Sequence, residues 1–231
     1  MILNGEKKLV GLSNLQKEIL KIFSKIEEQE NFYLTGGTAL SAFYLHHRLS
    51  EDLDLFTPEE PLINIVGERF RKNLESENFS VNTIRRFSAF FEMVATKKEE
   101  GVRIQLALDS PFRFEEPEVA EIGVKIDSLI DIATNKLLTV FGRAEVRDFV
   151  DLFFLIKEGY FKLDELIEKS REKDPGLDDY YLAVAFNKVK DFPDELNKLP
   201  IILYRKLDFI KLKRFFQEEA MNLLKEGEPK R

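Results

Sequence analysis

The chain has 231 residues and a mass of 27.0 kDa, and its composition (44% hydrophobic, 33% charged) is that of a folded globular protein rather than a disordered one. It contains no cysteine and only two histidines, His46 and His47, which excludes disulfides, thiolate zinc sites and a cysteine nucleophile. The 42 acidic residues outnumber the 35 basic ones, so a generic nucleic-acid binder is excluded and carboxylate-plus-metal chemistry stays open.

The first half of the chain is expected to mix helices and strands. Ser13 and Gln16 form a capping-box pattern ahead of apolar residues at helical spacing, which predicts the first helix. Short runs rich in β-branched and aromatic residues predict the strands. In chain order, the expected elements are helix 14–28, strand 32–34, helix 38–46, strand 53–56, helix 63–75, strands 79–84, 87–95 and 102–109, and a short strand near Val124.

From residue 128 onward the pattern becomes helical, with helices expected over 129–141 and 147–157 and a stop at Gly159. This change predicts a boundary between a core over 1–126 and a helical C-terminal domain over 127–231. No uninterrupted apolar run reaches the roughly 18–20 residues of a membrane helix, so we expect a cytoplasmic protein with no membrane partner.

Gly36 and Gly37 separate a predicted strand from a helix that starts at Thr38. Glycines allow close backbone approach, and a helix N-terminus offers N–H groups and the positive end of the helix dipole, which together suit a phosphate group. Arg48 and Ser50 follow, and we expect them to contact phosphate oxygens. The alternatives are an ordinary tight turn at the glycines and local salt bridging and capping by Arg48 and Ser50.

Asp52 and Asp54 are expected on one face of a strand whose other face carries Leu53 and Leu55. Two carboxylates at this spacing repel each other unless a cation lies between them, and oxygen ligands suit Mg²⁺. The alternative is a solvated strand edge. Because the glycine turn and the acidic pair fall in one strand–helix–strand unit, we favour a metal-dependent phosphate site.

Lys136 lies in the middle of the apolar stripe of the predicted helix 129–141, and Asp151 lies within an apolar run of the next helix. A lysine that faces a core must be paired or must line a cavity. Two readings stay open. In one, Lys136 and Asp151 form a structural ion pair; in the other, Lys136 binds nucleotide phosphates while Asp151 positions it or acts on the acceptor hydroxyl.

Two motifs, in order, resemble one family. The first reads Gly36-Gly37-Thr38-Ala39-Leu40 and then His47-Arg48-x-Ser50-x-Asp52-Leu53-Asp54-Leu55-Phe56. The second reads Ser128-Leu129-x-Asp131-Ile132-Ala133-x-Asn135-Lys136 and then Arg147-Asp148-x-x-Asp151-Leu152. Both are similar to motifs of the AbiEii/AbiGii toxin nucleotidyltransferases, which belong to the polymerase-β-like nucleotidyltransferase superfamily.

The resemblance implies an α/β (α+β) fold with a mixed central sheet and a C-terminal helical domain that closes over the active-site cleft. It also implies transfer of a nucleotide from an NTP to a hydroxyl, with Mg²⁺ or Mn²⁺ as cofactor. It implies Asp52 and Asp54 as metal ligands, a phosphate-binding turn at Gly36, Gly37 and Thr38, and catalytic roles for Lys136 and Asp151. It also implies a third carboxylate from a later strand, for which Asp109 is the candidate, although an Asp before Ser110-Pro111 is also an ordinary turn former.

For biology, the resemblance implies the toxin of a toxin–antitoxin or abortive-infection system, with an RNA acceptor such as a tRNA 3′ end and a cognate antitoxin protein as partners. Two alternatives keep the fold: nucleotidylation of a protein or a kinase-like phosphoryl transfer, and a catalytically silent module that binds a nucleotide or an antitoxin. The intact Asp52–Asp54 pair and the inward Lys136 argue against the silent module.

Overall fold

The computed structural model describes residues 11–226, and these form two compact units, one ending at Asp131 and the other beginning at Ile132. Residues 1–10 and 227–231, the outer ends of the predicted domains 1–126 and 127–231, lie outside the described residues. The division between the units falls inside helix α4 (Leu129–Gly142), whereas the sequence pattern changes near residue 126.

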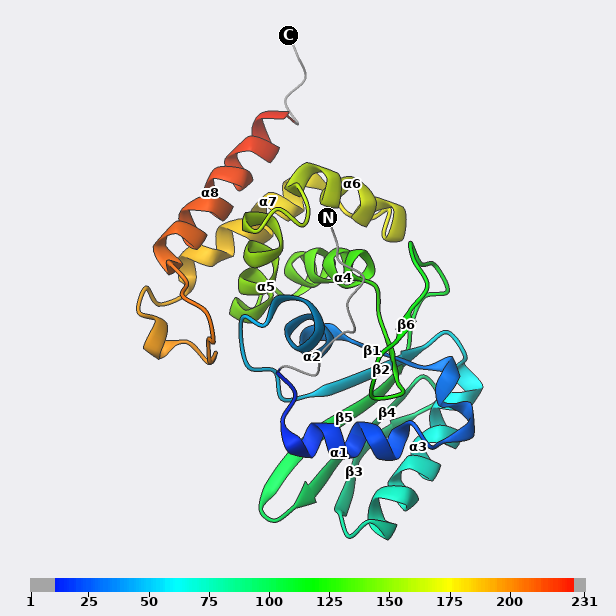
Figure 1. Ribbon diagram of the computed structural model, residues 1–231. Helices are drawn as coiled ribbons and strands as arrows, with labels where there is room; N and C mark the ends of the chain where they lie inside the picture. The colour runs from blue at the N-terminus through cyan, green and yellow to red at the C-terminus, as the bar shows by residue number, and fades with distance from the viewer. Residues whose placement is uncertain (1–10, 227–231) are drawn as a thin grey trace. The chain divides into compact units, whose positions relative to one another are not determined.

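Within the first unit, the described strands form one mixed sheet in the order β3-β4-β5-β2-β1-β7-β6 (Figure 1). The central strand β2 runs parallel to β5 and antiparallel to β1, and β1 runs parallel to β7. The mixed α/β fold predicted from the sequence is therefore confirmed. The strands are β1 (Tyr33–Thr35), β2 (Leu53–Thr57), β3 (Ser80–Phe87), β4 (Phe90–Lys97), β5 (Glu100–Leu108), β6 (Glu118–Val119) and β7 (Lys125–Ile126).

The helices α1 (Asn14–Phe23) and α3 (Glu60–Ser76) cover one face of this sheet, and α2 (Gly36–Leu40) lies over the other (Figure 1). The covered face is apolar: Leu53 and Leu55 of β2 are buried on it, and Phe23 of α1 packs against Phe70 of α3 with ring centroids 5.0 Å apart. We call the opposite face, which carries Asp54, Gln105 and Glu92, the polar face.

Three predicted helices differ from the observed ones by two residues or more, and one of them is α3, which begins at Glu60 rather than at 63. The capping box is present, since Gln16 N–H donates to Ser13 Oγ and Ser13 N–H donates to Gln16 Oε1, but α1 ends at Phe23 rather than at 28. Ile26 is buried from an extended backbone, so its place in the apolar pattern needs no helix. The second helix starts at Gly36, two residues early, and continues as a π-helix over Ser41–Leu45.

Strands β3, β4 and β5 form an antiparallel meander. The β4–β5 turn consists of Lys98 and Glu99, both with positive φ (50° and 70°), which is the backbone of a type I′ hairpin. The β3–β4 pairing shifts register between Thr83 and Arg85, which is a β-bulge around Ile84.

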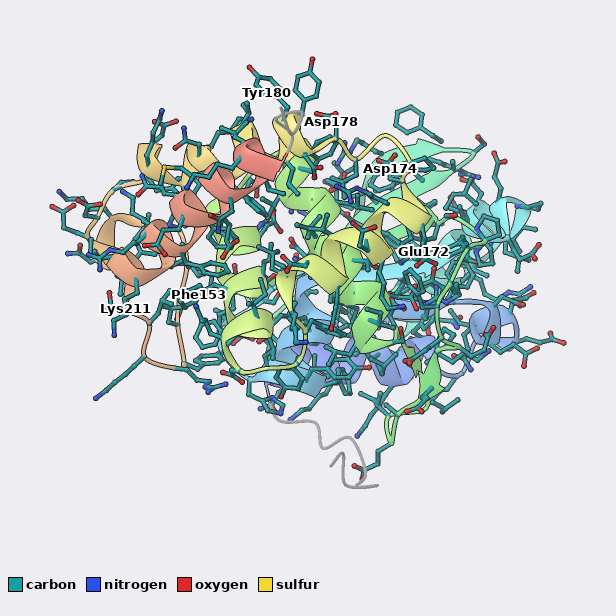
Figure 2. All side chains as sticks on the ribbon, turned by 90° about the horizontal axis from the view of Figure 1, so that it is seen from above. Phe153, Glu172, Asp174, Asp178, Tyr180 and Lys211 are labelled. Carbon is teal, nitrogen blue, oxygen red and sulfur yellow. The ribbon has the colours of Figure 1, made fainter. Side chains whose placement is uncertain are left out.

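The second unit is helical and has an aromatic core. The Phe216 ring lies 4.9 Å from that of Phe149 and 5.1 Å from that of Phe186 (centroid to centroid). Asp178 caps α7 by accepting from Tyr181 N–H, and Tyr180 in the first turn points away from the ribbon (Figure 2). Its helices after α4 are α5 (Val146–Lys157), α6 (Leu163–Lys173), α7 (Asp179–Asn187) and α8 (Phe209–Glu226), with 3₁₀ turns at Lys188–Asp191 and Leu196–Lys198.

Within residues 11–226, no helix combines the length and the apolar character needed to cross a membrane.

Candidate functional site

The turn between β1 and α2 packs directly against the side chain of Asp54. Thr35, the last residue of β1, is the register partner of Asp54 on β2, so the chain passes over Asp54 as it leaves the strand. Gly36 has a φ of +70°, and a Cβ at this position would collide with the Asp54 carboxylate. The position therefore requires glycine both for its backbone conformation and for space.

Gly37 lies equally close to the loop that leads to the acidic pair. A Cβ on Gly37 would come within 2.6 Å of an Arg48 guanidinium nitrogen and 3.0 Å of Ser50 Oγ. Thr38 Oγ1 lies 2.9 Å from Ser50 Oγ and also donates to the backbone carbonyl of Asp52. The structure thus brings the glycine turn, Thr38, Arg48 and Ser50 next to the Asp54 carboxylate and the Asp52 backbone, and their roles at a phosphate site stay a prediction.

This loop is held from behind by a residue whose second role the sequence analysis missed. Gln16 is buried, and its Nε2 donates to the carbonyls of Ser50 (2.9 Å) and Glu51 (3.1 Å). Its Oε1 at the same time completes the capping box of α1. A capping glutamine uses only its oxygen, so the two remaining amide donors were a signal that it contacts another segment.

Asp52 and Asp54 are both partly exposed residues. Residues 11–226 contain no cluster of three or more His, Cys, Asp or Glu side chains arranged to hold a metal. An acidic pair without a complete cage suits Mg²⁺ or Mn²⁺, since Mg²⁺ is bound through one or two carboxylates while water and substrate phosphates fill its other positions. The residues present therefore fit a divalent cation that binds together with a phosphate substrate.

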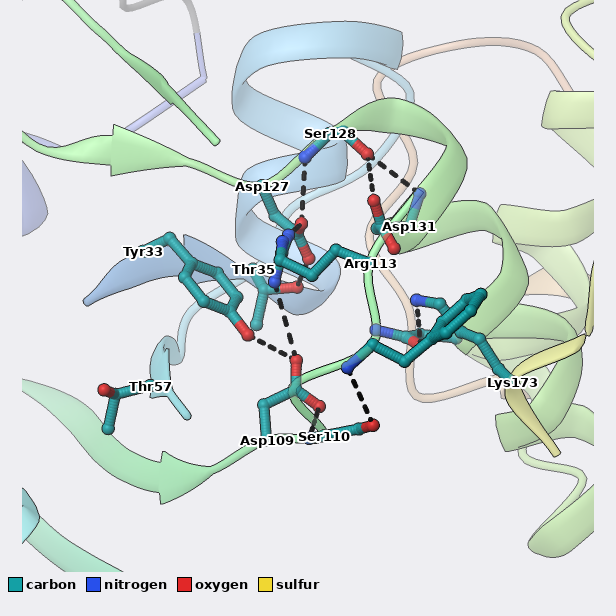
Figure 3. Close-up of polar contacts among 12 residues, drawn as sticks. Tyr33, Thr35, Thr57, Asp109, Ser110, Arg113, Asp127, Ser128, Asp131 and Lys173 are labelled. Atoms are coloured by element: carbon teal, nitrogen blue, oxygen red, sulfur yellow. Dashed lines mark hydrogen bonds and ion pairs between the residues drawn. The ribbon is translucent and has the colours of Figure 1, made fainter. Parts of the chain in front are cut away.

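Asp109 is not brought to this pair. Its N–H donates to the Thr57 carbonyl (2.9 Å), and the residue of β5 that lies beside Asp54 is Gln105. Asp109 lies four positions after Gln105, which is about 13 Å along a strand. The Asp109 carboxylate instead accepts a hydrogen bond from the Tyr33 hydroxyl and lies 3.8 Å from the Arg113 guanidinium (Figure 3).

A buried acid that the sequence analysis did not single out lies on the other side of β1. Asp127 is fully buried, accepts from Thr35 Oγ1 (2.6 Å) and Ser128 N–H (2.9 Å), and pairs with Arg113 (Figure 3). Because Thr35 is the residue just before Gly36, Asp127 fixes the start of the glycine turn. The signal available in the sequence was an acidic residue directly after strand β7, where a buried carboxylate needs polar partners from neighbouring segments.

Arg113 also lies over the Tyr33 ring, with its guanidinium carbon 4.0 Å from the ring centroid. Burial of the Tyr33 hydroxyl and its hydrogen bond to Asp109 raise the pKa of Tyr33 well above its ordinary value. Tyr33 therefore stays protonated and continues to donate to Asp109. Together these contacts fix the segment after β5 against β1.

Lys136 belongs to the second unit and is buried there among acids. Its ammonium lies 2.8 Å from Asp151 Oδ2 and 3.2 Å from Asp148 Oδ1, and both aspartates are fully buried. Arg143 Nε lies 2.9 Å from Asp148 Oδ2. The ion pair expected in the structural reading is therefore present, with Asp148 as an additional member, and a role of Lys136 toward nucleotide phosphates stays a prediction.

A family model described as the nucleotidyl transferase AbiEii toxin of type IV toxin–antitoxin systems matches residues 18–226. The chain belongs to the AbiEii family. It is therefore a nucleotidyltransferase by family. It is also similar to an uncharacterized protein, aq_aa25, of Aquifex aeolicus (strain VF5), with 29% identity over 193 residues that cover 80% of this chain and 86% of that protein.

Two crystal structures from Helicobacter pylori share the fold of this AbiEii nucleotidyltransferase. One is of a candidate nucleotidyltransferase, with a TM-score of 0.62 and 22% identity over 93% of this chain and 97% of that one. The other is of JHP933, with a TM-score of 0.58 and 24% identity over 92% of this chain and 90% of that one. At these identities the likeness extends to the fold alone.

Proposed function

We propose that the protein transfers a nucleotide from an NTP to a hydroxyl of an RNA acceptor, such as a tRNA 3′ end, with Mg²⁺ or Mn²⁺ as cofactor. The observation that carries the proposal is the close packing of the Gly36-Gly37 turn against the Asp54 carboxylate. This contact sets a backbone suited to phosphate directly beside an acid suited to a divalent cation. An NTP–metal complex needs both groups together.

In this mechanism each group of the site has a defined task. Asp52 and Asp54 would hold the cation, which would supply positive charge to the triphosphate when bound. The first-turn N–H groups at Gly36, Gly37 and Thr38 contact phosphate oxygens, since a helix N-terminus has no intrahelical acceptors for them. The acceptor hydroxyl gives its proton to solvent, its oxygen forms a bond to the α-phosphorus, and the bond from the α-phosphorus to the bridging oxygen breaks, so that pyrophosphate leaves.

Arg48 and Ser50 act behind this turn. Arg48 is buried with its guanidinium against Gly37, so its positive charge lies under the phosphate position and strengthens anion binding there. Ser50 connects Thr38 to the loop that carries Asp52. We further propose that Lys136 contributes positive charge toward the phosphates and that Asp151, together with Asp148, positions its ammonium. Support for that role comes from the family's lysine-helix motif.

The test is incorporation of label from α-labelled NTPs into tRNA in the presence of Mg²⁺, resolved on a denaturing gel. We expect wild-type protein to label RNA and Asp54→Asn to fall to background. Glu51→Gln is the matched control, because it removes the same charge from an exposed neighbour and should keep activity. Label carried into RNA or protein from the γ position, or α-label entering protein alone, would contradict the proposed reaction.

We also propose that the protein acts as a toxin countered by a cognate antitoxin protein. Support comes from the family, whose model is described as the nucleotidyl transferase AbiEii toxin of type IV toxin–antitoxin systems. Induced expression of the wild-type chain in a bacterial host should arrest growth, while Asp54→Asn at the same expression level should not. Equal arrest by both proteins would contradict a toxicity that depends on nucleotidyl transfer.

A further inference from the structure

Two arginines on the polar face converge on one buried glutamate, close to the acidic pair. The side chain of Glu92 in β4 is only 1% exposed. Its carboxylate nevertheless accepts hydrogen bonds from Arg85 Nε of β3 at 2.5 Å and from Arg103 Nη1 of β5 at 3.1 Å. Gln105 adds an amide contact at 3.3 Å. Both arginine side chains are 52% exposed, so each guanidinium is fixed on one side and open to solvent on the other.

The β-bulge determines that Arg85 faces this way. Before the bulge Thr83 pairs with Met93, so in a regular ladder Ile84 would lie opposite Glu92 and Arg85 would lie on the apolar face. The extra residue in β3 shifts the register, and Arg85 pairs with Glu92 instead. Bulges commonly re-aim side chains near functional sites. The bulge is therefore the feature that adds a second guanidinium to the polar face.

The arginines are accompanied by exposed aromatic surface. The Arg85 guanidinium carbon lies 5.0 Å from the centroid of the Phe90 ring. Phe87 is the register partner of Phe90 and is 63% exposed, although phenylalanine is normally buried. A cationic surface with accessible rings is the chemistry that binds single-stranded nucleic acid, where phosphates contact arginine and bases stack on aromatic faces.

The position of this surface relates it to the acidic pair. Asp54, Gln105 and Glu92 are successive register partners on β2, β5 and β4, and Arg85 follows on β3. At about 4.8 Å per strand, Glu92 lies about 10 Å and Arg85 about 14 Å from Asp54 along the sheet. These distances are short enough for the last few nucleotides of a strand whose terminal hydroxyl reaches Asp54 to contact these residues.

We propose that Arg85, Arg103, Phe87 and Phe90 bind the single-stranded end of the RNA acceptor. This inference rests on the proposed nucleotidyl transfer to RNA and names the surface that holds the acceptor. Glu92 is a positioning residue: it fixes both guanidiniums before RNA arrives, which lowers the entropy lost on binding. One carboxylate shared by two arginines leaves a net charge of +1 at this spot of an otherwise acidic protein.

The binding experiment measures fluorescence anisotropy of a short, fluorescein-labelled single-stranded RNA across a series of salt concentrations. Removal of two phosphate contacts to single-stranded RNA makes the negative slope of log K against log salt shallower by about 1.4. This corresponds to a loss of about 25-fold in affinity at about 0.1 M salt. We expect this from Arg85→Gln/Arg103→Gln. The matched control is Arg86→Gln, because Arg86 is the adjacent residue, is exposed, and pairs with Glu68 rather than with Glu92.

A second variant avoids disturbing the buried glutamate. Phe87→Ala removes an exposed ring and leaves no polar group unpaired, and we expect it to weaken RNA binding about tenfold through lost stacking. Thermal unfolding of each variant establishes that it is folded. The inference is overturned if both variants match Arg86→Gln in RNA affinity and in salt slope. It is also overturned if wild-type protein does not bind the RNA.

The nucleotidyl-transfer assay separates this inference from the proposed function. If it holds, Arg85→Gln/Arg103→Gln raises KM for RNA and leaves binding of the Mg²⁺–NTP complex unchanged, as measured by its stabilisation of the folded protein. If wild-type protein labels RNA and the double variant retains its KM, the acceptor binds elsewhere and nucleotidyl transfer stands. If wild-type protein labels only protein substrates, both the acceptor class and this surface assignment are wrong.

Discussion

The buried cluster around Lys136 gives the sharpest test of the two roles open for this lysine. At an effective dielectric constant of about 20, ion pairs at 2.8 Å and 3.2 Å supply about 6 and about 5 kcal/mol of attraction. Desolvation of the three buried groups cancels most of this gain, but loss of one partner leaves a buried charge behind. We therefore expect Lys136→Met to lower the free energy of unfolding by about 3–5 kcal/mol.

Urea unfolding followed by circular dichroism measures this loss, and the thermal midpoint should fall on the order of 10 °C. The control is Lys162→Met, because Lys162 is 81% exposed and pairs with Glu165 at the surface, where such a pair contributes less than about 1 kcal/mol. A loss below about 1 kcal/mol for Lys136→Met would refute the electrostatic reasoning.

A double variant then separates structure from catalysis. Lys136→Met/Asp151→Asn removes a negative charge together with the lysine, so we expect it to recover part of the lost stability. If Lys136 contributes charge to the NTP, nucleotide incorporation stays low in this variant despite the recovered stability. If activity returns in step with stability, the lysine has only a structural role and our proposal for it is wrong.

Four further changes test other parts of the first unit. Gly36→Ala should cost about 1–2 kcal/mol at a φ of +70° and abolish nucleotide incorporation by displacing Asp54, so an active, stable variant would contradict the packing argument. Gln16→Ala should cost about 2 kcal/mol of unfolding free energy and lower kcat/KM for the NTP, whereas unchanged kinetics would show that the loop holds its shape alone. The hydrogen bond from Arg85 lowers the pKa of Glu92 below its ordinary value of 4.5, so wild type should exceed Glu92→Gln in stability above that pH. This excess in stability should shrink as the pH falls through the lowered pKa of Glu92. A stability difference between the two proteins that stays constant in acid would refute the predicted pH dependence. Glu99→Gly should raise stability by about 1 kcal/mol in thermal unfolding, because a φ of 70° strains a side-chain-bearing residue, and no gain would argue against the type I′ turn.

Local patterns were enough to predict most of the first unit's elements. The alternation of Val102, Ile104 and Leu106 placed these residues on the buried face of β5, and the Ser13–Gln16 capping box marked the start of α1. Helix ends were predicted less well. Ile26 continues the apolar spacing of α1, but an extended residue reaches the core equally well, so periodicity alone does not reveal where the helix stops.

The parts of the candidate site that depend on nearby residues were predicted from the sequence, and the parts that depend on distant residues were not. The glycine turn and the pair Asp52–Asp54 lie close in sequence, so spacing and strand alternation were sufficient to associate them. Asp109 was misplaced because its position depends on the register between β2 and β5, which no local pattern specifies. For the same reason the buried Asp127 was missed, since its partners Thr35 and Arg113 become neighbours only in the folded sheet.

The pairing of β2 with β5 also bears on when activity arises during folding. The meander β3–β4–β5 is built from adjacent segments, whereas Asp54 and its partner Gln105 are about fifty residues apart in the chain. Contacts between distant segments require closure of a larger loop and form more slowly, so we expect β2 to join a meander that already exists. A nascent chain that has not yet closed the sheet would have Asp54 beside the glycine turn but apart from Gln105, Glu92 and Arg85, so we expect the proposed acceptor surface to join the glycine–aspartate site only at this late step.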